Sequence, residues 1–212
     1  MLLNNRRKLL ERYCRNKIVL DIGCVGGIGG NGEDDKFTHD IIRNVAKEVV
    51  GLDYNKKAVE YWNIRGYNLI HADASEPNLD LGKRFDVVFA GEVIEHIENQ
   101  GIFLDNVKKH LDEEGIFILT TPNAHDIAYH INRILFRIKD DYDICKNIGH
   151  VVVHSYGTLK SLLERHGFNI VETHYVNSIC LTWRRSLLKI ITYFFNDFAE
   201  SVLFVARTRK EK

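Results

Sequence analysis

Four acidic residues stand where four successive apolar runs of the chain end. They are Asp21, Asp53, Asp73 and Glu92. The carboxyl ends of parallel strands meet at one edge of a sheet, so we expect these carboxylates to face a common ligand. A carboxylate at the end of the second strand commonly accepts both hydroxyls of a ribose and repels a 2′-phosphate. The pattern therefore predicts a ligand that contains a ribose.

A glycine-rich turn follows the first apolar run, in the segment Leu20–Gly27. Glycines such as Gly23 and Gly26 let the backbone turn sharply and approach a ligand closely. Asp21, at the start of the turn, is placed either to hold a cationic group or to order the turn. The next nine residues, Ile28–Lys36, are rich in glycine and acids and lack apolar periodicity, so we expect a ligand-ordered loop there.

A second cluster of reactive side chains lies directly after the fourth run, in Glu92-Val93-Ile94-Glu95-His96. Residues i, i+3 and i+4 share one face of a helix, which would bring Glu92, Glu95 and His96 together. Two carboxylates and an imidazole can bind a divalent cation or supply a general base. In the structural alternative, which we favour over the metal, the glutamates cap or solvate the helix and His96 packs against the ligand.

Seven apolar runs are expected to form the strands that position these residues, with helical patterns between most of them. This alternation is typical of an α/β fold. The expected strands are Ile18–Leu20, Glu48–Asp53, Asn68–His71, Phe85–Ala90, Ile116–Thr121, Asn169–Tyr175 and Ser201–Arg207.

The expected helices begin with Leu3–Cys14 at the start of the chain. The helix after the glycine turn should begin near Lys36, because the preceding loop has no helical pattern. A later helix should end at a glycine cap formed by His166-Gly167. The segment Leu181–Phe198 carries an aromatic stripe at helical spacing.

The motifs, taken in order, resemble those of the class I S-adenosylmethionine-dependent methyltransferases. Within that family the chain resembles the small-molecule methyltransferase domains of the ubiquinone-biosynthesis type. The resemblance is strong over residues 18–123. It implies an α/β fold with a Rossmann-like seven-stranded, mostly parallel sheet, an antiparallel last strand and helices on both faces. It also implies one methyltransferase domain over residues 1–212, with an acceptor-binding insertion at about 124–153.

The resemblance assigns roles to the strand ends. The turn in Leu20–Gly27 would lie under the methionine part of S-adenosylmethionine, Asp53 would bind its ribose, and Asp73 with Ala74 would recognise its adenine. The predicted cofactor-binding residues are Asp21, Gly23, Gly26, Asp53, Tyr54, Asp73, Ala74 and Glu92.

Two branches of the family, the ubiquinone-biosynthesis O-methyltransferases and the small-RNA 2′-O-methyltransferases, have a similar Glu-x-x-Glu-His segment and use it with a later histidine to hold a metal. Here the ligands would be Glu92, Glu95 and His96 with His150 or His154. We do not favour a metal. The predicted catalytic residues are His96 and Glu92, acting on the proton of an acceptor hydroxyl.

The predicted function is methyl transfer from S-adenosylmethionine to a small molecule, at oxygen. Two alternatives stay open: a metal-assisted RNA 2′-O-methyltransferase, and a non-catalytic cofactor-binding partner subunit. A dehydrogenase is a weaker rival, because the turn lacks a clean Gly-x-Gly-x-x-Gly pattern. The net charge of zero gives no electrostatic case for nucleic acid.

Other features of the sequence bear on the cellular location and on contact with membranes. The four cysteines are scattered, and the first residues lack an apolar signal core, so we expect reduced thiols and a cytoplasmic location. No apolar run is long enough to span a membrane. The aromatic stripe with nearby basic residues at 184–198 predicts a helix that packs in the core, in a homodimer, or weakly on a membrane surface.

Overall fold

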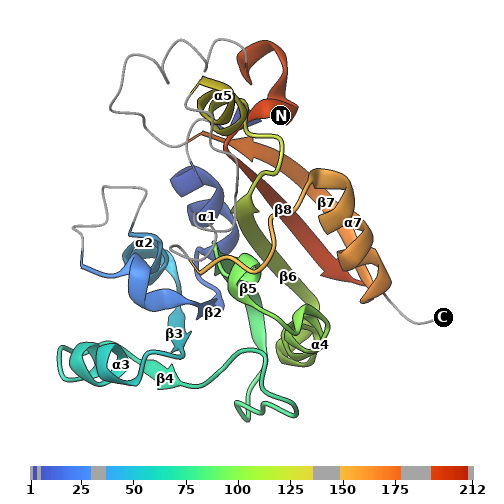
Figure 1. Cartoon of the computed structure of the whole chain (residues 1–212). Helices are drawn as coiled ribbons and strands as arrows, with labels where there is room; N and C mark the ends of the chain where they lie inside the picture. Colours follow the sequence, from blue (N-terminus) through green and yellow to red (C-terminus); the bar gives the residue numbers. More distant parts are fainter. Residues whose placement is uncertain (1, 4–5, 30–36, 136–148, 178–191, 210–212) are drawn as a thin grey trace.

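The chain is built around one twisted sheet, shown in the computed structural model of Figure 1. The structure describes residues 2–3, 6–29, 37–135, 149–177 and 192–209. The sheet has eight strands in the order β1-β7-β8-β6-β5-β2-β3-β4. The strands are β1 Leu2–Leu3, β2 Ile18–Ile22, β3 Glu48–Asp53, β4 Leu69–His71, β5 Phe85–Gly91, β6 Leu111–Pro122, β7 Phe168–Val176 and β8 Ser201–Thr208.

The predicted seven-stranded, mostly parallel sheet with an antiparallel last strand is confirmed. β8 runs antiparallel to both β6 and β7, and the other strand pairs are parallel. An eighth strand is added at the edge, where Leu2 and Leu3 pair with Tyr175 and Val176 of β7. The helix expected from Leu3 therefore begins only at Arg6.

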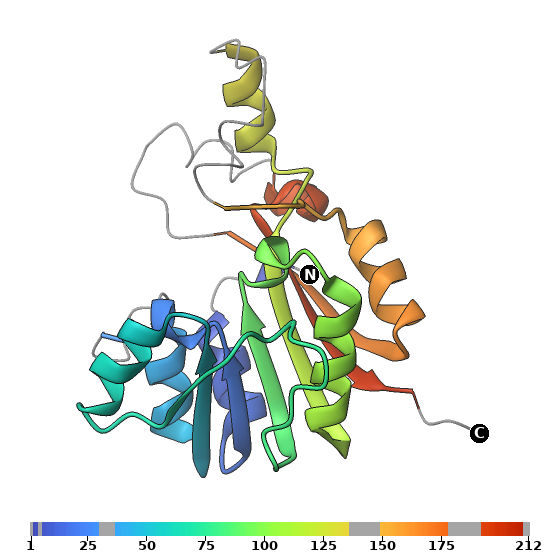
Figure 2. The same cartoon turned by 60° about the horizontal axis from the view of Figure 1, so that its bottom comes forward.

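Helices cover both faces of the sheet, as Figures 1 and 2 show. The α-helices are α1 Arg6–Cys14, α2 Thr38–Val45, α3 Lys56–Asn63, α4 Gln100–His110, α5 Ile127–Leu135 and α7 Tyr156–Arg165. α2 begins two residues after the expected Lys36. α7 starts at a capping box formed by Ser155 and Thr158 and is followed by Gly167 at φ +81°, which confirms the glycine stop.

The alternation of side chains along the central strands creates two apolar cores. On β5, Val88 and Ala90 belong to the core beneath α4 and α7, whereas Val87 and Phe89 belong to the core beneath α1 and α2. Successive side chains of a strand point to opposite faces, so a strand covered on both sides must be apolar throughout. This is why the central strands appear in the sequence as continuous apolar runs.

The order of the strands fixes where a ligand can bind. From β2 the chain moves outward through β3 and β4 and then returns to β5 on the other side of β2. The loops that follow β2 and β5 therefore lead away from each other at the carboxyl ends of these two strands. Open α/β sheets bind their ligands in the crevice between two such loops.

One polar network fastens α1 to β7. Glu172 accepts hydrogen bonds from Arg12 and Tyr13 of α1, at 2.7 and 2.8 Å, and from His174 of its own strand at 2.8 Å. Burial opposes ionisation of Glu172, but the three partners outweigh it and hold its pKa at about 2, below the ordinary 4.5. The charged form is therefore the one that stabilises the fold.

We expect Glu172→Gln to lower the free energy of unfolding by about 1 kcal/mol at pH 7, because the carboxylate is partly exposed. A depressed pKa stabilises the fold above the unfolded value and loses that effect as the pH falls from about 4.5 toward 2. Denaturant titrations of the unaltered protein and of Glu172→Gln should therefore show a difference in the free energy of unfolding that is smaller at pH 3 than at pH 7. Equal stability at pH 7 would show that the network adds nothing.

The described residues contain no helix long and apolar enough to cross a membrane. Of the segment proposed for surface contact, 184–191 lies outside the described residues. In the remainder, three exposed aromatic residues precede the short 3-10 helix η3 (Asn196–Phe198) and a fourth ends it: Tyr193, Phe194, Phe195 and Phe198. Contact with a membrane surface stays a prediction, as does a homodimer. Most of the loop predicted at Ile28–Lys36 also lies outside the described residues.

Candidate functional site

A cavity of about 700 Å³ lies at the carboxyl ends of β2, β3 and β5, where the strand order reverses. It brings together most residues that the sequence singled out. Those that line it are Gly23, Asp53, Tyr54, Asp73, Ala74, Glu92 and His96.

The turn after β2 can be made only by glycine at Gly23. Its φ is +74°, a left-handed conformation that side chains rarely adopt. A Cβ atom there would also lie 2.5 Å from Cγ2 of Val93, across the cavity wall. The backbone of the turn thus approaches the β5 side closely, and Gly23 leaves open the floor on which a ligand can lie.

Asp53 is held in place by two backbone N–H groups. Its two carboxylate oxygens accept hydrogen bonds from the backbone N–H groups of Val25 and Asn55, at 3.1 and 2.9 Å. Each oxygen keeps a lone pair for another donor. Asp73 is more exposed, and one of its oxygens accepts both the N–H and the hydroxyl of Ser75. Both acids are therefore oriented before any ligand binds.

Asp21 and Gly26 are not among the residues that line the cavity. Asp21 is buried beneath the turn, where its carboxylate lies 2.8 Å from Nδ1 of His39. Burial raises its pKa, and the hydrogen bond from His39 opposes the rise. Of the two roles predicted for Asp21, ordering the turn is the one that this position favours. Asp40, which follows His39 in the chain, also helps to order this segment, because its carboxylate accepts the N–H of Gly29 at 3.0 Å.

The helix expected over Glu92–His96 is wrong. Glu92 has a φ of +56°, and only Ile94–His96 form a short 3-10 helix, η2. The three side chains consequently do not share a helical face. Glu92 lines the cavity, and burial raises its pKa. Glu95 instead turns into the interior beside Thr121 of β6.

His96 is exposed at the cavity and is oriented by a backbone group. Its Nδ1 lies 2.9 Å from the carbonyl oxygen of Gly149, and a carbonyl can only accept, so Nδ1 carries the proton. In the neutral ring the lone pair therefore resides on Nε2. The ring of His150 packs edge-on against His96, with 4.8 Å between centroids. This arrangement suits a base that receives a proton at Nε2.

The buried carboxyl of Glu95 completes the cluster. One oxygen accepts the Thr121 hydroxyl at 3.0 Å, while Oε1 is buried and has no hydrogen-bond partner among the described residues. Burial, with a contribution from the charge of Glu92, raises the pKa of Glu95 to about 8, so the neutral acid dominates near pH 7.

The metal-ligand set expected from the sequence is only partly brought together. Glu95, His96 and His150 offer ligand atoms that all lie within 4.8 Å of one another, and in the described part of the chain they form the one such group. Glu92 and His154 are not part of it. His154 is buried beside Asn123, and burial lowers its pKa.

Several residues that line the cavity carried no signal of their own in the sequence. Ile22, Leu52, Ala72 and Val93 adjoin the motif residues, so their neighbours could have indicated them. Gly149 adjoins the candidate ligand His150, but nothing in the sequence placed it at this cavity. Its φ of +73° and its bond to His96 become apparent only in the fold.

Comparison with known proteins adds three findings. A family model described as a methyltransferase domain matches residues 2–173. A relative from Mycolicibacterium smegmatis, named as a probable S-adenosylmethionine-dependent methyltransferase, is 30% identical over 166 residues, which cover 77% of this chain. The matched region is 56% of that relative, so the chain spans little more than half of its length.

Solved structures share the fold at low sequence identity. A chain from the complex between the Haloferax volcanii Trm112 methyltransferase activator and a putative methyltransferase aligns with a TM-score of 0.66 at 13% identity, covering 97% of this chain and 89% of that one. The N-methyltransferase NodS from Bradyrhizobium japonicum, in complex with S-adenosyl-L-homocysteine, gives 0.62 at 15% identity, covering 97% and 86%.

Proposed function

Because this chain belongs to the family of methyltransferase domains, we propose that it transfers the methyl group of S-adenosylmethionine to a hydroxyl group of a small molecule. The observation that carries the proposal is a shared cavity. The turn at Gly23 and the acids Asp53 and Asp73 line the same space as His96. The residues proposed for the cofactor and the proposed base therefore share one cavity.

The residues present fit the cofactor. The floor left open by Gly23 would take the methionine part, the two oriented oxygens of Asp53 would accept the ribose hydroxyls, and Asp73 with Ala74 would hold the adenine. Tyr54 lines the cavity and is 79% exposed, so its ring offers a face for stacking. Asp53 also disfavours a 2′-phosphate by charge.

The cofactor supplies a methyl group already activated on a sulfonium, so the protein must mainly align the acceptor. A hydroxyl also needs to lose its proton as its oxygen attacks. Nε2 of His96 is placed to take that proton, and the Gly149 carbonyl stabilises the resulting imidazolium through Nδ1–H. The Glu92 carboxyl lines the same cavity and can orient the acceptor.

A metal-assisted reaction is the second candidate, because Glu95, His96 and His150 converge and Glu95 Oε1 has no hydrogen-bond partner in the described part of the chain. A cation there would act on the acceptor oxygen in place of a free base. Because burial raises the pKa of Glu95 to about 8, a cation would have to displace a proton from this carboxyl near pH 7.

An assay of methyl transfer to a metabolite extract, with identification of the product, tests both the acceptor atom and the dependence on a metal. We expect an O-methyl ether, and turnover that persists after treatment with EDTA. A product methylated at nitrogen or carbon would contradict the proposed acceptor atom. Loss of turnover with EDTA, restored by Mg²⁺, Mn²⁺ or Zn²⁺, would replace the free base with the metal.

A further inference from the structure

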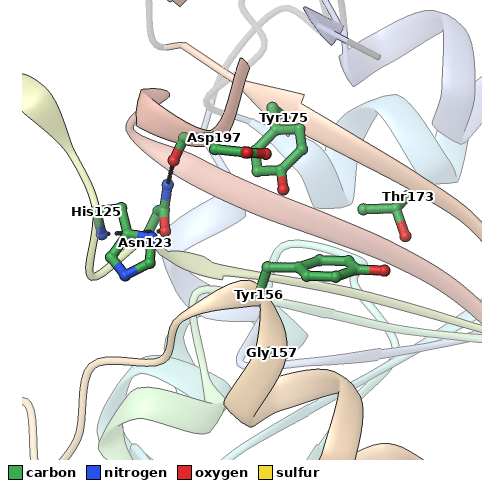
Figure 3. Close-up of a pocket in the computed structure, with 7 residues that line it drawn as sticks. All are labelled: Asn123, His125, Tyr156, Gly157, Thr173, Tyr175 and Asp197. Carbon is green, nitrogen blue, oxygen red and sulfur yellow. Dashed lines mark hydrogen bonds between the residues drawn. The ribbon is translucent and has the colours of Figure 1, made fainter. Parts of the chain in front are cut away.

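A second cavity, of about 450 Å³, lies beside the ends of β6, β7 and α7 and shares no lining residue with the first. Figure 3 shows its walls. They are Asn123, His125, Tyr156, Gly157, Thr173, Tyr175 and Asp197. The two cavities are neighbours along the chain: Gly149 borders the first, and the same segment continues through His154 to Tyr156 at the second.

The walls of this second cavity are fixed by hydrogen bonds and by ring packing. The side-chain N–H₂ of Asn123 donates to the carbonyls of Asp197 and Ala199, at 2.7 and 2.8 Å, and so fastens the turn that carries Asp197. The ring of Tyr156 stacks on Phe204 of β8, with 5.5 Å between centroids and an interplanar angle of 17°. The cavity is therefore a formed feature of the fold.

The chemistry of the walls favours a cation. Asp197 supplies a carboxylate, and Tyr156, Tyr175 and Thr173 supply hydroxyls. In Figure 3 the Tyr175 hydroxyl is directed toward Tyr156, with Asp197 beside the Tyr175 ring. No lysine or arginine is among the lining residues described. A protonated amine can donate to the carboxylate and hydroxyls and lie against aromatic faces, whereas an anion would be repelled.

Charged groups also lie around the cavity. Glu200 follows this turn closely, and its charge adds to the rise that burial causes in the pKa of Glu92, with Arg6 opposing it. The Lys160 ammonium, 6.0 Å from the centre of the Tyr156 ring, lies 3.8 Å from the Glu164 carboxylate. Lys160 is thus paired with Glu164, and both Arg6 and Glu200 act on Glu92.

We propose that the second cavity is an amine-binding subsite, in which Asp197, Tyr156 and Tyr175 hold a protonated amino group of the methyl acceptor while its hydroxyl reaches His96. The acceptor would then be a small hydroxylated amine. Its role as acceptor rests on the function proposed above, but amine binding in this cavity does not. Part of the segment expected to bind the acceptor, 124–153, contributes His125 to the wall.

Benzylamine, benzyl alcohol and benzoate are suitable probes, because they share a shape and differ in charge. Ligand-detected NMR titrations of the full chain, with and without S-adenosylhomocysteine, should show benzylamine binding at least about fivefold more tightly than benzyl alcohol, and benzoate not at all. Asp197→Asn should abolish this preference while leaving the affinity for S-adenosylhomocysteine unchanged.

A second variant tests the location without altering charge. A Cβ atom at Gly157 would meet nothing within 4 Å, so Gly157→Leu should fold and fill the cavity. It should remove benzylamine binding. Equal binding of benzylamine and benzyl alcohol, or benzylamine binding that survives both substitutions, would overturn the subsite. Failure to bind S-adenosylhomocysteine would overturn the proposed function instead, so the two failures are distinguishable.

Discussion

Replacing His96 with alanine is expected to lower kcat about 10²–10⁴-fold, the range typical of a lost general base. The Kd for S-adenosylmethionine should change by no more than about twofold, because the ring acts on the acceptor proton. His96 is exposed and is held by the Gly149 carbonyl, so its removal leaves no buried partner in the core. Single-turnover assays and calorimetric titrations measure the two effects separately.

A matched histidine gives the control. His130 is also exposed and also contacts a backbone carbonyl, that of Ala124, but it does not line either cavity. His130→Ala should therefore leave kcat unchanged. A His96→Ala protein with full turnover would eliminate His96 as the base, and one that loses cofactor affinity to the same extent as turnover would assign it a binding role.

Replacing Asp53 with alanine is expected to raise the Kd for S-adenosylhomocysteine about tenfold or more. The lost contacts are charge-assisted hydrogen bonds to ribose hydroxyls, each contributing about 1.5–3 kcal/mol. The substitution also releases the N–H groups of Val25 and Asn55, which loosens the turn on the cavity floor. Both effects weaken binding, and calorimetric titration gives their sum.

Asp86→Ala separates loss of the ligand contact from general destabilisation. Asp86 also accepts a backbone N–H, that of Ile18 at 2.8 Å, but it lies at the opposite, amino end of β5. We expect Asp86→Ala to bind S-adenosylhomocysteine as the unaltered protein does. Undiminished affinity in Asp53→Ala, or an equal loss in both variants, would remove Asp53 from the ribose site.

The strands and the acids at their ends could be predicted because their signals are local. A strand covered on both faces must be apolar throughout, and parallel strands deliver their carboxyl ends to one edge. Asp53, Asp73 and Glu92 were therefore located in the cavity by their positions after such runs. Seven strands have this local signal, whereas the two residues of β1 pair only because β7 offers them an edge.

The shape of Glu92–His96 could not be predicted, because its spacing suits a helix and nothing in the sequence marks Glu92 as left-handed. The Thr120 carbonyl of the neighbouring strand accepts the Glu92 N–H at 2.9 Å, which prolongs strand pairing to that residue. The contact between His96 and Gly149 and the pair formed by Asp21 and His39 join distant segments. Such contacts depend on the packed fold, and no local pattern announces them.

The most direct test of the proposed cofactor site is a calorimetric titration of the full chain with S-adenosylmethionine, repeated in the presence of NAD. We expect saturable binding at one site per chain, with no competition from NAD, because Gly23, Asp53 and Asp73 form a single cavity. The absence of saturable binding, or displacement of S-adenosylmethionine by NAD, would contradict the account.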